Sequence, residues 1–357
     1  RAYGVVTGEP IVNALRKCPG LMLEPPDHKL YSRRSRELMT LLSDFSPDLE
    51  QVSVDECYLD YTPLCRQYPS PEEAAHLIKD RVRQELGFTV NVGISDRKVL
   101  AKMASDFRKP DLVHTLYASE IRHKLWPLPV SSLFMCGHSS VETLRKLEIL
   151  TIGDLACADR SVISAHLKSH GVLLWEYANG IDDSGVVVEQ AEAKGIGNST
   201  TLSQDAADRE TAHRVLLSLS ESVAGRLRRS GQSASMVSTE IKYNTFKKVS
   251  HQTTLLTPTS QTDIIYQTAC CLFDEIWDGT PVRLLGIRSS KLTAEGEPVQ
   301  LSLFDLPVPA QNGSAEASLY AGRPASRRKE QLDQALDAIR SRYGADAVVR
   351  GSLLSGR

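Results

Sequence analysis

Two adjacent carboxylates, Asp55 and Glu56, interrupt an apolar strand pattern. Neighbouring side chains on a strand point to opposite faces, so both acids cannot enter one core unless the strand ends, bulges or turns there. Mg²⁺ is commonly bound by one or two carboxylates together with substrate phosphates. The pair indicates either a magnesium site at a strand tip or a solvated hairpin corner. The flanking apolar residues predict a short, half-buried strand: Val52, Val54, Cys57 and Leu59.

A set of lysines follows on the next strand and helix that the chain predicts. Alternating apolar residues at 90–94 indicate the strand, Ser95 or Asp96 provides a helix cap, and Pro110 stops the helix. The apolar residues of this helix fall on one face and the lysines lie off it. Alone these lysines would be a solvated face, but beside the carboxylates they suit a triphosphate subsite: Lys98, Lys102 and Lys109.

These stretches resemble the palm domain of Y-family translesion DNA polymerases of the DNA polymerase IV type, the UmuC-domain family. The matching motifs are Ser-x-Asp-Glu at 53–56 and Gly-Ile-Ser-x-x-Lys-x-x-Ala-Lys-x-Ala-Ser-Asp-x-x-Lys-Pro at 93–110. The resemblance implies error-prone DNA synthesis with two Mg²⁺ ions, primer–template DNA and deoxynucleoside triphosphates. It makes Asp55 and Glu56 the catalytic metal ligands, with Glu56 beside the primer 3′-hydroxyl. It assigns the triphosphate to three residues: Arg1, Lys102 and Lys109.

The same resemblance raises a question about the start of the chain. The family's Asp-x-Asp metal motif, its aromatic steric gate and the tyrosine of its fingers motif precede the segment that matches Arg1 and do not occur in the printed sequence. We therefore expect a polypeptide of these residues alone to extend primers poorly, because two-metal chemistry needs its bridging aspartate. A non-catalytic DNA- and clamp-binding adaptor is the alternative, although such adaptors commonly lose the palm carboxylates.

The length of 357 residues predicts several domains, because single cores rarely grow that large. We expect an α+β multidomain chain in which the palm carries a ferredoxin-like sheet and the little finger carries two helices on a four-stranded sheet. The expected boundaries are a fingers remnant (1–26), the palm (27–129), a helical thumb with a helix-hairpin-helix (130–183), a linker (184–194), the little finger (195–292) and a flexible tail (293–357).

Two regions are predicted to contact DNA phosphates without reading bases. The thumb hairpin around Gly137 would offer backbone amides at a helix N-terminus. The little finger carries a basic cluster in which Glu240 is the only acid between 226 and 248. Such a cluster can be a solvated face or an electrostatic footprint for a duplex. Its members are Arg226, Arg228, Arg229, Lys242, Lys247 and Lys248.

The tail contains an isolated apolar cluster, Gln-Leu-Ser-Leu-Phe-Asp, at 300–305. It matches the peptide with which the family binds the bacterial sliding clamp, and its apolar side chains would fill a pocket on that partner. The alternative is that the cluster packs back on the little finger. A charged helix with an apolar stripe is expected at 326–343. The clamp-binding residues would be Gln300, Leu301, Leu303 and Phe304.

Composition adds few constraints. The net charge of −2 does not decide for or against nucleic acid, because a local basic stripe matters more than the sum. The seven cysteines lack Cys-x-x-Cys spacing, which argues against a zinc site or a disulfide framework. No apolar run approaches the ~20 residues that span a bilayer. We expect a monomeric bacterial protein without membrane attachment, located in the cytoplasm and associated with the nucleoid.

Overall fold

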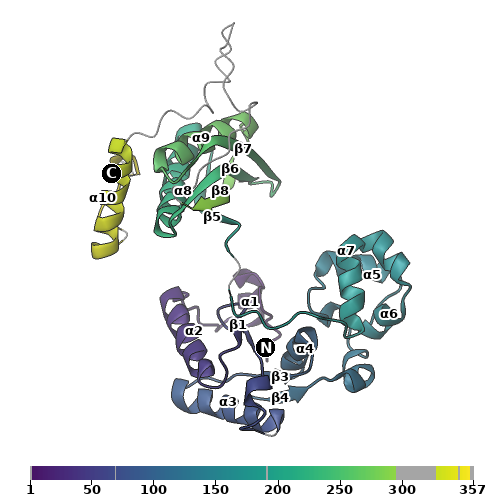
Figure 1. Ribbon diagram of the computed structural model, residues 1–357. Helices are drawn as coiled ribbons and strands as arrows, with labels where there is room; N and C mark the ends of the chain where they lie inside the picture. Colours follow the sequence, from purple (N-terminus) through teal and green to yellow (C-terminus); the bar gives the residue numbers. More distant parts are fainter. Residues whose placement is uncertain (1, 69, 190–191, 295–326, 345, 354–357) are drawn as a thin grey trace. The chain divides into compact units, whose positions relative to one another are not determined.

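The computed structural model describes residues 2–68, 70–189, 192–294, 327–344 and 346–353 (Figure 1). The chain divides into two units, Arg1–Gln190 and Ala191–Arg357. Within the described ranges, no helix is both long and apolar enough to cross a membrane.

The first part of unit 1 mixes helices with short strands. Strand β1 pairs antiparallel with β2, and β3 pairs parallel with β4. These are two separate two-stranded sheets, so the single ferredoxin-like sheet expected from the sequence is not formed by the described residues, because no pairing joins β2 to β3 or β4. The elements are α1 (Ile11–Lys17), α2 (His28–Ser43), β1 (Leu49–Gln51), β2 (Cys57–Leu59), α3 (Pro71–Leu86), β3 (Val92–Ile94), α4 (Lys98–Asp106) and β4 (Val113–Thr115).

Helices α2 and α3 pack together beside the β1–β2 hairpin. Helix α3 has strong local signals at both ends: Ser70 accepts a hydrogen bond from the Glu73 N–H at 3.3 Å, and Pro71 occupies the first turn. Gly87 ends the helix at φ 75°, a conformation that glycine adopts without strain. The apolar faces of both helices form one core together with Phe45, which follows α2, and Leu64: Leu38, Leu41, Leu42, Phe45, Leu64, Ile78 and Val82.

The second part of unit 1 is helical, with α5 (His138–Lys146), α6 (Ile152–Cys157) and α7 (Arg160–Ala178). Its core extends into α4, because Leu100 and Met103 belong to the same buried cluster as Leu144 and Leu155. The palm–thumb boundary expected near residue 130 therefore separates residues that share a core. Short 3₁₀ and π turns connect the longer elements: Thr62–Leu64, Ala118–Glu120, Ile121–Leu125 and Val130–Ser132.

Unit 2 contains an antiparallel sheet with strand order β5-β8-β6-β7, and helices α8 and α9 cover one face of it (Figure 1). Buried residues alternate along β6, where Val237 and Ile241 face the helices while Lys242 lies on the opposite, open face. The elements are β5 (Gly195–Ala206), α8 (Arg209–Arg229), β6 (Gln232–Tyr243), β7 (Lys248–Thr259), α9 (Thr262–Ile276), β8 (Val282–Ala294), α10 (Arg327–Tyr343) and the 3₁₀ turn Gly351–Leu353.

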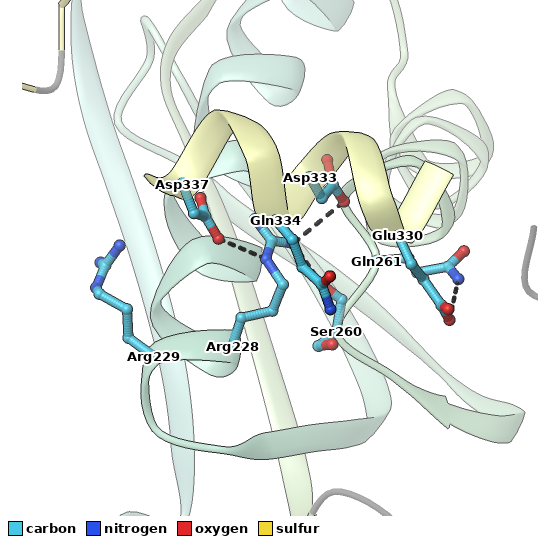
Figure 2. Close-up of a pocket in the computed structure, with 8 residues that line it drawn as sticks. All are labelled: Arg228, Arg229, Ser260, Gln261, Glu330, Asp333, Gln334 and Asp337. Carbon is cyan, nitrogen blue, oxygen red and sulfur yellow. Dashed lines mark hydrogen bonds and ion pairs between the residues drawn. The ribbon is translucent and has the colours of Figure 1, made fainter. Parts of the chain in front are cut away.

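Helix α10 contacts α8 and the start of α9 through charged side chains (Figure 2). Asp337 accepts from Arg228 Nε at 2.6 Å. Asp333 is 4% exposed and accepts from Arg228 Nη1 at 3.2 Å and from the Thr262 N–H at 2.9 Å. The N-cap residue of α9, Gln261, forms no side-chain capping bond, so Asp333 supplies the cap from a distant part of the chain.

The apolar stripe of α10 is exposed, since Leu332, Ile339 and Tyr343 are among the exposed large hydrophobic residues. The helix thus packs on the rest of unit 2 through charged side chains of both signs, Asp333 and Asp337 with Arg228, and Arg340 with Glu221. The charged helix expected at 326–343 is present as α10 (Arg327–Tyr343). It is held to the rest of unit 2 by ion pairs, so the expected flexible tail does not include it, and β8 extends two residues past the expected start of the tail.

Candidate functional site

The two carboxylates lie at the tip of the β1–β2 hairpin. The strands pair as far as Gln51 and Cys57, and beyond them the Ser53 N–H donates to the Glu56 carbonyl at 3.1 Å. Ser53 Oγ also donates to Asp55 Oδ1 at 2.9 Å. The local turn therefore holds Asp55 in an exposed position next to half-buried Glu56.

The half-buried strand predicted around these acids begins only at Cys57. Val52 and Val54 are exposed, because they belong to the hairpin tip and not to a paired strand. Burial raises the pKa of the Cys57 thiol to about 11, in keeping with an apolar hairpin base. The prediction for the two valines was wrong. Of the alternatives for the acids, in which the strand ends, bulges or turns, the structure has the turn.

Lysines of α4 and the loop after it connect to one of the hairpin acids, Glu56, through a chain of ion pairs. Lys102 Nζ bonds to Glu56 and lies 3.0 Å from Asp106, and Asp106 lies 2.8 Å from Lys109 Nζ. Burial disfavours the charged form of Lys102, but the hydrogen bonds to Glu56 and Asp106 outweigh it and raise the pKa of Lys102. The lysine is therefore charged at neutral pH. We call Asp55, Glu56, Lys102, Asp106 and Lys109 the hairpin–α4 cluster.

The position of α4 depends on close packing and on a distant cap. A Cβ atom on Gly93 would overlap the Ala101 carbonyl oxygen and lie 2.5 Å from the Ser105 nitrogen, so only glycine allows β3 to run this close to the helix. At the helix start, Asp182 Oδ2 accepts from the Val99 N–H at 2.9 Å.

The predicted caps, Ser95 and Asp96, are wrong, because the N-cap residue is Arg97 and its side chain forms no capping bond. Burial opposes ionisation of Asp182, but hydrogen bonds from Ser184 and Val99 outweigh it and lower the pKa of Asp182.

Lys98 does not join the cluster. Its Nζ lies 2.6 Å from Glu50, donates to the Gly185 carbonyl at 3.2 Å and sits 4.8 Å from the ring centroid of Tyr58. Glu50 also accepts from the Val187 N–H at 2.7 Å. This lysine therefore joins the hairpin to the segment that follows α7, and the expectation that it faces a triphosphate is not supported.

The cluster offers two carboxylates on which a hard cation could bind. No group of three or more His, Cys, Asp or Glu residues with metal-binding geometry occurs in the parts of the chain that the structure describes. Two carboxylates are nevertheless sufficient for Mg²⁺ when phosphate oxygens of a substrate complete the coordination. The chemistry of Asp55 and Glu56, both hard oxygen donors, therefore fits a magnesium ion that arrives with a nucleotide.

A second polar site lies on the open face of the unit 2 sheet. Lys242 and Lys248 are direct cross-strand partners, an arrangement that is destabilising unless other charges compensate. Glu240 lies 2.8 Å from Lys248 Nζ. Lys247 follows in the turn and is exposed. Three predicted phosphate-binding lysines thus lie together.

Sequence reasoning missed a further arginine on this face. Arg288 is exposed and pairs across the sheet with Gly197, where a Cβ atom would touch the arginine side chain. The buried neighbours Ile287 and Ser289 alternate with it along β8. This alternation could have predicted from the sequence that Arg288 lies on the open face. The residue was missed because the predicted basic cluster was confined to 226–248, and β8 lies outside that stretch.

The three arginines at the end of α8 differ in what they contact. Arg226 Nη1 donates to the Gly197 carbonyl at 2.8 Å. Arg228 is paired with the acids of α10, and exposed Arg229 lines the pocket beside them (Figure 2). The charge of Arg228 is compensated within unit 2, so we leave this residue out of any DNA-contacting surface.

Gly137 is the N-cap residue of α5, and it forms no side-chain capping bond. No atom lies within 4 Å of the position that a Cβ on Gly137 would take, so there is open space beside the N-cap of α5. The remaining predicted site residues lie outside the described residues: Arg1, Gln300, Leu301, Leu303 and Phe304.

Comparison with known proteins identifies similar chains. Residues 1–106 match the impB/mucB/samB family, and residues 193–303 match the C-terminal domain of that family. A DNA polymerase IV from Clostridium acetobutylicum is 42% identical over 354 residues, which cover 99% of this chain and 85% of the relative. DNA polymerase IV 1 from Bacillus subtilis is 35% identical over 357 residues, covering 99% of this chain and 82% of the relative.

A solved structure of a Y-family DNA polymerase chimera has a similar fold. The TM-score is 0.73 at 22% sequence identity, and the match covers 83% of this chain and 86% of the other.

Proposed function

Because this chain belongs to the Y-family of DNA polymerases, in its DNA polymerase IV branch, we propose that the hairpin–α4 cluster is the site of template-directed nucleotidyl transfer. By family the protein is a DNA-directed DNA polymerase, and its relatives support a role in translesion DNA synthesis. The observation that carries the proposed site is the chain of ion pairs from Glu56 through Lys102 and Asp106 to Lys109.

In this proposal Asp55 and Glu56 would hold Mg²⁺ together with the phosphate oxygens of the incoming nucleotide. Bound metal ions of this kind lower the pKa of the primer 3′-hydroxyl and stabilise the charge that develops on the leaving pyrophosphate. Exposed Asp55 is open to the nucleotide, while half-buried Glu56 is held in place by Lys102. Asp55 and Glu56 can thus bind the same metal ion although one is exposed and the other is held by a lysine.

The lysines balance the negative charge of the triphosphate. Lys102 is largely buried, whereas the Lys109 side chain is about half exposed and can move toward a ligand. In the free protein, Asp106 bonds to both lysines, which keeps their ammonium groups close to the carboxylates without leaving a buried charge unpaired. The negative charges of a bound triphosphate would replace part of the charge compensation that Asp106 gives to Lys102 and Lys109.

We further propose that the open sheet face of unit 2 contacts the DNA backbone through Lys242, Lys247, Lys248 and Arg288. Backbone contacts are sequence-independent and salt-dependent, as a polymerase that copies any template requires. The amides at Gly137 would contribute one more phosphate contact.

Tethering to the sliding clamp stays a proposal drawn from the sequence motif at 300–305. Alanine at Leu303 and Phe304 should abolish pull-down of the bacterial clamp and leave DNA binding unchanged. Pull-down that persists would exclude this peptide as the tether.

Primer extension tests the active site. The gene product that includes residues 1–357 is compared with its Asp55→Asn and Glu56→Gln variants, which retain side-chain size but remove a charge. Each should lower kcat by ~100-fold or more, the scale of one electrostatic element in an active site. Asp183→Asn is the matched control, because the Asp183 side chain is 90% exposed and its ion pair with Arg97 is a long one of 3.8 Å.

The outcomes separate the hypotheses. If Asp55→Asn and Glu56→Gln extend primers as fast as Asp183→Asn, the carboxylates are not the metal ligands. If the unmodified protein binds primer–template DNA but does not extend it with Mg²⁺, the polymerase proposal fails and the DNA-binding adaptor remains.

A further inference from the structure

The turn between β6 and β7 carries an exposed aromatic side chain. Phe246 is 62% exposed at the tip of this hairpin. Its N–H donates to the Tyr243 carbonyl at 2.9 Å, and its φ of 68° lies in the left-handed region that a phenylalanine rarely adopts. The turn therefore holds a large apolar ring in solvent, in a backbone conformation that a glycine or asparagine would adopt more readily.

Two cations already lie against this ring. Lys242 Nζ is 4.6 Å and Arg283 Cζ is 5.3 Å from the ring centroid, both within cation–π range. The ladder between β6 and β8 shifts register here, since Lys242 pairs with Leu284 but Tyr243 pairs with Val282. The irregularity leaves Arg283 without a cross-strand partner and aims its side chain toward the hairpin tip.

The surroundings of the ring are basic. Lys247 follows it in the turn and Lys248 begins β7, both exposed. Two acids interact with these lysines: Glu240 lies 2.8 Å from Lys248 Nζ, and Asp278 interacts electrostatically with Lys247. We call Phe246, Lys242, Arg283 and Lys247 the hairpin-tip platform.

This combination matches one ligand chemistry. A single exposed ring is too small for an apolar protein interface or for membrane insertion, where contiguous apolar area is needed. A ring flanked by cations instead fits a flat, unpaired nucleobase with a phosphate on either side, as in proteins that bind single strands by stacking and charge. Paired bases within a duplex do not present their faces.

We infer that the hairpin-tip platform binds an unpaired segment of DNA by stacking a base on Phe246, with phosphates held by the neighbouring cations. The inference rests on the proposed function in one respect, namely that DNA is the ligand of this unit. It adds that part of the bound DNA is single-stranded and that the contact does not depend on base identity, because every base offers a stacking face.

The test measures the affinity of the full chain for two probes, an oligothymidylate and a blunt-ended duplex, by fluorescence anisotropy. Phe246→Ala should weaken binding of the oligothymidylate by roughly 5- to 150-fold, the range that corresponds to removing one base–aromatic stack. Duplex affinity should change by less than about twofold, and the salt dependence of binding should be unchanged, since no charge is removed. Phe246→Tyr keeps the stacking surface and should bind as the unmodified protein does.

Phe246→Leu separates stacking from apolar bulk. It retains an apolar side chain at the tip but no aromatic face, so it should behave as the alanine variant does. Hydrogen exchange of β6 and β7 checks that the hairpin itself is intact in each variant. Equal weakening of both probes by Phe246→Ala would overturn the inference, because the ring would then only support the hairpin.

Unchanged binding of the oligothymidylate by Phe246→Ala and Phe246→Leu would also overturn it. In that case duplex binding and primer extension by the unmodified protein would still stand, so the polymerase proposal would survive. If the unmodified protein binds neither probe, the proposed DNA-binding surface fails together with the platform.

Discussion

Replacing Asp333 by asparagine should loosen α9 and α10 together. The Asp333 carboxylate is 4% exposed and accepts hydrogen bonds from the guanidinium groups of Arg228 (3.2 Å) and Arg350 (3.1 Å) and from the Thr262 N–H (2.9 Å). Asparagine has nearly the same shape but no charge, and it presents an NH₂ group to a site occupied by donors.

The magnitude follows from two effects of one side chain. Breaking a buried ion pair by removing one partner costs about 3–5 kcal/mol, and loss of a helix N-cap costs about 1 kcal/mol. The two are not additive, because the same carboxylate performs both roles. We expect the opening free energy of α9 to fall by about 3–4 kcal/mol, which corresponds to amide exchange roughly 100- to 1,000-fold faster.

Hydrogen exchange followed by mass spectrometry measures this directly on peptides from α9. Asp337→Asn is the matched control on the same helix. Asp337 is 21% exposed, and among the described residues its ion pair is with Arg228, so its exchange effect should stay under about tenfold. Equal effects from the two variants, or no change with Asp333→Asn, would refute the view that Asp333 caps α9.

Three further predictions concern unit 1. Gly93→Ala should lower the free energy of unfolding by about 1–3 kcal/mol in urea titrations, because its Cβ would overlap the Ala101 carbonyl and force α4 away; Gly20→Ala, with open space around it, is the control. The lowered pKa of Asp182 means that its stabilisation is fully present above its unfolded pKa of about 3.9 and is lost as pH falls through the folded value. Asp182→Asn should therefore flatten the acid limb of the stability–pH curve, and an unchanged limb would contradict the cap. Lys102→Met should raise KM for the incoming nucleotide by ~10-fold or more through loss of a charged hydrogen bond, and an unchanged KM would remove Lys102 from the triphosphate site.

Local patterns predicted much of the candidate site. The adjacent acids, the glycine before the helix and the lysines on its polar side are contiguous in the chain, and turns and helices organise residues over such short spans. The same reasoning placed Val52 and Val54 in a strand, because alternation alone does not show whether a partner strand is present. It also grouped Arg228 with DNA-contacting residues, because its acidic partners on α10 are more than 100 residues away.

Residue patterns were sufficient to identify the family of this chain, most of its helices and the residue types of its site. The groups that complete those elements come from distant segments that meet in the folded chain. Helix α4 is capped by Asp182, 83 residues from Val99, and α9 by Asp333, 71 residues from Thr262. A helix N-terminus leaves amides that must find acceptors, but nothing local specifies which distant carboxylate reaches them. Long-range packing makes that choice, because it alone sets which segments meet.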